Sequence, residues 1–150
     1  MTQRHPLAST YNQLQNVRNP YQNPARKVLC VCSAGLLRSP TLAVILSQKP
    51  YNFNTRAVGV DVGHALIPVT EALLHWADIV IAVDPYTARS VKHLYNDFDI
   101  HEDDLPLITL NVPDKYARMD PKLIKAIKKE LKHINENVYH LIAPKETNDA

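Results

Sequence analysis

A cysteine and an arginine lie six residues apart in the first third of the chain, and both residue types suit chemistry on an oxyanion. Cys32 offers a sulfur nucleophile, and Arg38 offers a planar fork of N–H donors that matches two oxygens of a phosphate group. Ser39 follows directly, and its hydroxyl can either cap a helix or donate to the sulfur. This spacing predicts a phosphate-binding loop with a thiolate at its base.

The residues around this loop predict a strand before it and a helix after it. Val28 to Val31 is an apolar run typical of a buried strand, and the apolar stretch after Pro40 is typical of a helix. The first backbone N–H groups of a helix have no partner within it and bind phosphate readily. Gly35, one of only three glycines, allows the loop to turn its amides inward. A cysteine in such a positive site readily loses its proton.

The loop resembles the phosphate-binding loop of low-molecular-weight protein tyrosine phosphatases, which also follows the first strand. Gly35 stands where members often carry asparagine, and Leu37 stands where they often carry a second cysteine. The resemblance implies that Cys32 and Arg38 are catalytic. It also implies that phosphate is bound by the whole loop, which comprises Ser33, Ala34, Gly35, Leu36, Leu37, Arg38 and Ser39.

The alternation of strand and helix patterns predicts one α/β domain. Strands are expected over 27–31, 53–60, 78–83 and 105–112. Helices are expected over 40–48, 68–77 and 85–95, and from Asp120-Pro121 onward. Such alternation implies a four-stranded parallel sheet with helices on both faces. The resemblance adds the strand order 2-1-3-4. The expected division is a polar, disordered arm over 1–26, a phosphatase-like domain over 27–142 and a frayed tail over 143–150.

Composition and charge are typical of a soluble globular protein. Apolar residues make up 45% of the chain, with no run long enough to span a membrane and no apolar signal core, so a cytoplasmic location is expected. The first 60 residues hold seven Lys or Arg and none of the 15 acidic residues, which favours an anionic substrate. No base-reading motif is present, so no nucleic-acid partner is expected. The histidines show no metal-ligand spacing, and neither a metal nor a cofactor is expected.

A phosphate ester's leaving oxygen needs a proton, so a carboxylic acid is expected at the sheet edge that carries the loop. Asp84 and Asp120 each precede a proline and a helix, and helix capping explains both. Asp114 lies in mid-loop, and the resemblance places the general acid in a similar Asp-Pro-Tyr context, with Lys115 here in place of the proline. Asp114 is therefore the expected acid and Asp120 the alternative. Tyr116 either stacks on an aryl phosphate or is an ordinary half-buried loop tyrosine.

These features predict a metal-free phosphomonoesterase that forms a cysteinyl-phosphate. Its expected partner is a phosphotyrosine-containing protein or peptide, or a small aryl phosphate. One alternative is a catalytically weak module that only binds phosphate groups. Another is an arsenate reductase, which shares this fold and loop but needs further cysteines, and only Cys30 is available. Cys30 is expected to be a small core residue, with protection of an oxidised Cys32 as its rival role.

Overall fold

The computed structural model describes residues 26–33, 37–61, 63, 65 and 67–142, the last eight of them for the backbone only. All four strands are parallel and form one sheet in the order β2-β1-β3-β4, which confirms the predicted topology. The strands are β1 (Lys27–Cys32), β2 (Asn54–Gly59), β3 (Ile79–Ala82) and β4 (Leu107–Thr109). The described helices are α2 (Arg38–Ser47), α3 (Glu71–Trp76), α4 (Pro85–Asp97) and α5 (Pro121–Ile142).

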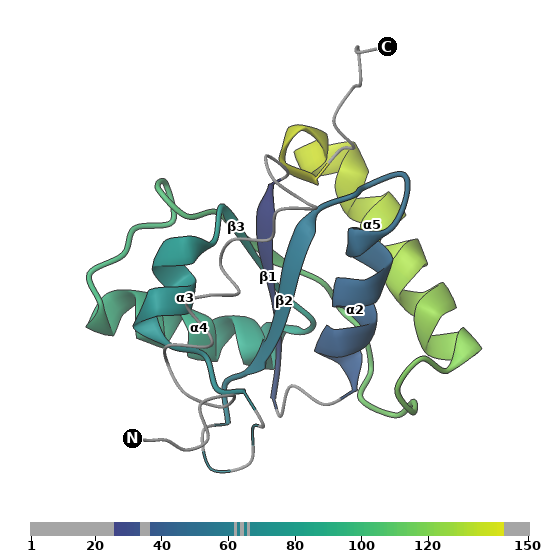
Figure 1. Ribbon diagram of the computed structural model, residues 1–150, viewed down its shortest axis with the longest axis horizontal. Helices are drawn as coiled ribbons and strands as arrows, with labels where there is room; N and C mark the ends of the chain where they lie inside the picture. Colours follow the sequence, from purple (N-terminus) through teal and green to yellow (C-terminus); the bar gives the residue numbers. More distant parts are fainter. Residues whose placement is uncertain (1–25, 34–36, 62, 64, 66, 143–150) are drawn as a thin grey trace, which may run out of the picture.

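The sheet lies between two layers of helices, with α2 and α5 on one face and α3 and α4 on the other (Figure 1). Alternate residues of the central strand β1 serve the two faces, because successive side chains of a strand point in opposite directions. Val28 and Cys30 pack with α2 and α5, whereas Leu29 and Val31 pack with α3 and α4. Strand β1 is therefore buried on both sides, and its carboxyl end is held at the centre of the sheet.

Helix α5 buries the apolar face that the sequence predicts. Leu123, Ile127 and Leu131 recur every four residues and expose no surface, while Ile124 and Ile134 are half-buried. The lysines form the solvated side of the helix, namely Lys122, Lys125, Lys128, Lys129 and Lys132. In the described part of the chain no helix has both the length and the apolar character needed to cross a membrane.

Several element boundaries differ from the prediction, among them the following three. Helix α2 begins at Arg38, two residues early, so the arginine lies in its first turn. Helix α3 begins at Glu71 instead of Pro68, because the Thr70 side chain caps it by accepting a hydrogen bond from the Leu73 amide at 3.2 Å. Strand β4 covers only the middle of 105–112, because the Leu105 amide donates to the His101 carbonyl in a turn and Pro106 has no N–H.

Several predicted features lie outside the described residues. They are most of the arm over 1–26, the tail over 143–150 and the middle of the loop at Ala34, Gly35 and Leu36. The described residues fix the two ends of that loop, since Cys32 closes β1 and Leu37 is the N-cap of α2.

Candidate active site

The sulfur of Cys32 lies beside the hydroxyl of Ser39 at the junction of β1 and α2. The two atoms are 3.1 Å apart and both residues are buried. The hydroxyl also lies 3.3 Å from the Val58 carbonyl of β2. The sequence left two roles open for Ser39. The capping role is wrong, because the N-cap of α2 is Leu37 and no side chain makes a capping hydrogen bond at this helix start. The structure instead brings the hydroxyl to the sulfur, where it can donate a hydrogen bond to a thiolate.

Backbone hydrogen bonds hold the start of the loop against the segment that follows β2. The Val60 amide donates to the Cys32 carbonyl at 3.0 Å, and the Asp61 amide donates to the Ser33 carbonyl at 2.8 Å. These bonds extend the pairing of β1 with β2 past the end of the strands. The direction in which the chain leaves Cys32 is therefore set by the sheet.

Arg38 is buried, and groups from two later segments, those that follow β3 and β4, surround its guanidinium. Nη1 donates to Asp84 Oδ2 at 2.5 Å and to the Val112 carbonyl at 2.9 Å. Nε lies 3.6 Å from Asp114 Oδ1. Only 3% of the residue is exposed, so the side chain is held in one place. Because Asp84 follows β3 and Val112 follows β4, Arg38 joins the carboxyl ends of these strands to the start of α2.

The hydrogen bonds of Arg38 leave one edge of its guanidinium available. Both are made by Nη1, and within the described residues Nη2 has no protein partner. The edge formed by Nε and Nη2 presents two parallel N–H groups, which is the arrangement that binds two oxygens of one oxyanion. The Asp114 carboxylate stands beside that edge. Arg38 is thus held through Nη1, and its Nε–Nη2 edge faces the Asp114 carboxylate.

Asp84 takes part in the site, which the sequence interpretation missed. It caps α4 as predicted, since Oδ1 accepts the Thr87 amide at 2.7 Å, while Oδ2 binds Arg38. Burial by itself would raise the pKa of the Asp84 carboxyl, but hydrogen bonds from Thr87 and Arg38 and the Arg38 charge hold that pKa below its ordinary value. The predicted strand order carried the missed signal, because it places the end of β3 beside that of β1.

The two candidate acids have different surroundings. Asp114 lies against Arg38 with 62% of its side chain exposed, so it is both near the site and open to solvent. Asp120 accepts the Lys122 amide at 2.8 Å and begins α5, which is the capping role that the sequence predicts. Tyr116 is half-buried against the core, and Lys115 Nζ lies 5.4 Å from its ring centre. The structure therefore brings Asp114 to Arg38 and places Asp120 at a helix start.

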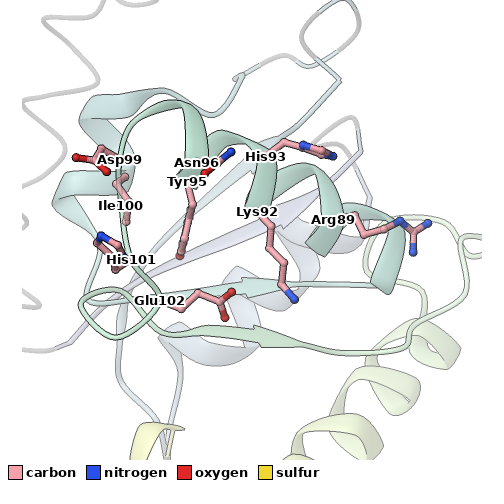
Figure 2. Close-up of a pocket in the computed structure, with 9 residues that line it drawn as sticks. All are labelled: Arg89, Lys92, His93, Tyr95, Asn96, Asp99, Ile100, His101 and Glu102. Atoms are coloured by element: carbon pink, nitrogen blue, oxygen red, sulfur yellow. The ribbon is translucent and has the colours of Figure 1, made fainter.

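A pocket of about 520 Å³ lies away from these residues. It is formed by α4 and the segment that follows it, and its lining contains neither Cys32 nor Arg38 nor Asp114. Figure 2 shows that its polar side chains point in several directions and do not converge on one point. Within the described ranges no group of three or more His, Cys, Asp or Glu side chains could hold a metal ion. His75, for example, pairs with Glu71 on the surface of α3 at 3.3 Å.

Comparison with known proteins identifies the fold. No protein-family model and no curated protein matches the sequence. Among solved structures, a mutant of YwlE from Bacillus subtilis is similar with a TM-score of 0.53 and 17% identity, over 78% of this chain and 99% of that one. The chain has the fold of YwlE. The likeness spans almost all of YwlE and leaves about a fifth of this chain outside it.

Two further structures match with lower scores. YwlE arginine phosphatase with a phosphorylated active-site serine has a TM-score of 0.48 and 18% identity, over 77% of this chain and 99% of that one. A low-molecular-weight phosphotyrosine phosphatase from Vibrio cholerae has a TM-score of 0.49 and 23% identity, over 75% of this chain and 97% of that one. The resemblance that the loop from Cys32 to Ser39 suggested is thus confirmed at the level of the fold.

Proposed function

We propose that this chain is a cysteine-dependent phosphomonoesterase that acts on phosphotyrosine in proteins or peptides. The observation that carries the proposal is the position of Arg38, whose Nη1 is held by Asp84 and Val112 while its Nε–Nη2 edge faces the exposed Asp114 carboxylate. Arg38 begins α2, and the next residue, Ser39, contacts the Cys32 sulfur. A nucleophile, an oxyanion-binding fork and a nearby carboxyl group are the parts that such a reaction requires.

In the first step of this proposal the Cys32 thiolate attacks phosphorus. A sulfur–phosphorus bond forms, the bond between phosphorus and the tyrosyl oxygen breaks, and Asp114 gives its proton to that oxygen. Arg38 holds two of the phosphoryl oxygens through the transition state with Nε and Nη2. The Ser39 hydroxyl stabilises the thiolate by donating to it across the observed 3.1 Å contact.

In the second step water attacks the cysteinyl-phosphate. The Asp114 carboxylate accepts a proton from the water as the new phosphorus–oxygen bond forms. The sulfur–phosphorus bond breaks, and inorganic phosphate and the Cys32 thiolate are released. The exposure of Asp114 suits this role, because the same carboxyl group must meet first the leaving oxygen and then a water molecule.

Phosphoarginine is a second substrate to test, because the fold is shared with YwlE, which is described as an arginine phosphatase. In that reaction a phosphorus–nitrogen bond breaks and the acid protonates nitrogen. Two alternative functions are tested alongside it. One is binding of phosphate groups without turnover, and the other is reduction of arsenate. The buried Cys30 is the only other cysteine in the chain, which leaves arsenate reduction without a solvent-accessible second thiol.

The deciding experiment measures phosphate release from a phosphotyrosine peptide, a phosphoarginine peptide and an aryl phosphate, with a metal chelator present. We expect turnover by the wild-type protein and none by Cys32→Ser. Mass spectrometry of the acid-quenched wild type should find one added phosphoryl group on the peptide that contains Cys32. Cys30→Ser is the matched control, since it changes the other buried cysteine of the same strand. Full activity in Cys32→Ser would overturn the proposal.

A further inference from the structure

Large apolar side chains that are exposed occur at four positions in the described part of the chain, and each follows a different strand. Leu37 follows β1, Ile67 follows β2, Tyr86 follows β3 and Met119 follows β4, with exposed fractions of 39%, 46%, 60% and 40%. In a parallel sheet these positions belong to one edge, because all the strands end there. The exposed apolar surface is therefore concentrated at the edge that carries the candidate active site.

One hydroxyl group links two of these residues. Thr41 Oγ1 donates to the Leu37 carbonyl at 2.8 Å and accepts the Met119 amide at 3.0 Å. Thr41 is buried in the first part of α2, so the loop before α5 is fastened over the start of α2. Met119 has φ 61°, a left-handed conformation that bulky residues seldom adopt. The loop thus holds an exposed methionine in one fixed backbone conformation.

The other two residues are tied to Cys32 and Arg38 from the opposite side. The Ile67 carbonyl accepts the Gly59 amide at 3.0 Å, and Gly59 is the residue of β2 that pairs with Cys32. Tyr86 lies in the first turn of α4, two residues after the aspartate that binds Arg38. Each exposed residue is thus connected to the candidate site by a short stretch of backbone, by hydrogen bonds or by both.

The four residues divide between the two faces of the sheet. Leu37 and Met119 precede α2 and α5, which cover one face, whereas Ile67 precedes α3 and Tyr86 belongs to α4, which cover the other (Figure 1). One pair of these residues therefore precedes or begins the helices on each face of the sheet. We call Leu37, Ile67, Tyr86 and Met119 together the apolar rim.

Building on the proposed function, we propose that the apolar rim binds large apolar residues that flank the phosphorylated residue on both sides in a protein segment. Residues that precede or begin helices on both faces of the sheet suit an extended segment, which rises about 3.3 Å per residue and can cross the sheet edge with side chains on both sides of the phosphorylated residue. Contact with such neighbours removes apolar surface from water on both partners. The substrate is then an exposed, apolar stretch of a phosphoprotein.

The test compares two phosphotyrosine peptides of equal length and charge, one with leucine and valine and the other with serine and glycine around the phosphotyrosine. Binding is measured by titration calorimetry to the full-length Cys32→Ser protein, so the result does not depend on turnover. We expect the apolar peptide to bind about tenfold more tightly. In the wild-type protein kcat/KM should show the same preference.

Variants of the rim show whether these residues cause the preference. Ile67→Ser and Tyr86→Ser, each combined with Cys32→Ser, should reduce the preference, and Met119→Asn should do so while keeping a residue type that tolerates the left-handed conformation. Ile100→Ser is the matched control. It changes a partly exposed isoleucine in the distant pocket of Figure 2, and the preference should persist.

The outcomes separate this inference from the proposed function. Equal affinity for the two peptides, or a preference for the apolar peptide that survives all three rim variants, would overturn the proposal that the apolar rim binds apolar residues of the substrate. If the apolar peptide binds more tightly but the wild type does not hydrolyse it, the result would support the binding role of the apolar rim and contradict the proposed phosphatase activity. Sedimentation that shows a dimer broken by Tyr86→Ser would assign this surface to a second copy of the chain, and that too would overturn the inference.

Discussion

The Asp84 carboxylate joins the buried guanidinium of Arg38 to the first turn of α4. One of its oxygens accepts from Arg38 Nη1 at 2.5 Å, while the other accepts the Thr87 amide at 2.7 Å. A single side chain thus holds Nη1 of Arg38 and caps a helix on the other face of the sheet. We infer that Asp84 positions Arg38 for catalysis.

Replacing Asp84 with asparagine should separate its two roles. Asparagine caps helices about as well as aspartate, so the fold should persist, but the charged bond to Arg38 is lost. We expect kcat to fall about ten- to hundredfold on every substrate, because a displaced Arg38 holds the transition state poorly. Asp120→Asn is the matched control, since it changes a carboxylate that precedes α5 and accepts the Lys122 amide. Equal losses in both variants would contradict the positioning role.

The lowered pKa of Asp84 predicts how stability changes in acid. A carboxyl whose pKa is lower in the folded than in the unfolded state stabilises the fold above its unfolded pKa, and that contribution is lost as the pH falls through the folded value. The free energies of unfolding of wild type and Asp84→Asn should therefore differ by a constant amount above the ordinary aspartate value of 3.8 and converge below it. Urea titrations at several pH values test this. A difference that grows as the pH falls would contradict the assignment.

Arg38→Lys should show whether the fork geometry matters or only the charge. Lysine keeps the positive charge but cannot offer two parallel N–H groups or bind both Asp84 and the Val112 carbonyl with the same geometry. We expect a loss of kcat on the order of 100- to 1,000-fold, as for removal of an oxyanion-binding donor. Circular dichroism should confirm that the variant is folded. Near-normal kcat in the folded variant would disprove the role proposed for Arg38.

The assignment of the general acid depends on the leaving group. A nitrophenolate leaves without help, whereas a tyrosyl oxygen needs a proton. Asp114→Asn should therefore slow phosphotyrosine hydrolysis about 100-fold or more, and nitrophenyl phosphate hydrolysis much less. If Asp120→Asn shows this dependence and Asp114→Asn does not, the acid is Asp120.

Oxidation should not join Cys30 to Cys32. They are two residues apart on one strand and on one face, so their Cα atoms are about 6.6 Å apart at 3.3 Å per residue, near the upper limit for a disulfide. Burial, and then the neighbouring Cys32, raise the pKa of the Cys30 thiol, which makes it a poor nucleophile. Peroxide should therefore inactivate wild type and Cys30→Ser at the same rate. Mass spectrometry that detects a disulfide between the two residues would contradict this.

Local sequence signals predicted the parts of this molecule that depend on neighbouring residues. The approach of Ser39 to the Cys32 sulfur follows from a strand, a short loop and a helix that are contiguous in the chain. The buried face of α5 follows from the spacing of Leu123, Ile127 and Leu131. The strand order came from the resemblance, and the structure confirms it.

The role of Asp84 could not be predicted in the same way. Capping fully explains an aspartate before a proline and a helix, so nothing in the neighbouring residues indicated a second partner for Asp84. The contact of Asp84 with Arg38 depends on which strands are neighbours in the sheet. It also depends on the direction of the Arg38 side chain, which lies 46 residues earlier in the sequence. The start of α2 at Arg38 was missed for a related reason, because tertiary contacts of the arginine hold a turn that has no side-chain cap.

The wide sequence separation of Arg38 from its partners has a consequence for biosynthesis. Its hydrogen bonds reach residues 46 and 74 positions later, at the ends of β3 and β4. A nascent chain that has emerged only through β2 already contains the whole loop from Cys32 to Ser39 but lacks the groups that orient the arginine. Contacts between residues distant in the sequence form late, after the entropy of closing the intervening loops has been overcome. The two hydrogen bonds that hold Arg38 Nη1 therefore cannot both form until synthesis has passed residue 112, about three quarters of the way along the 150-residue sequence, so we expect the proposed site to assemble late.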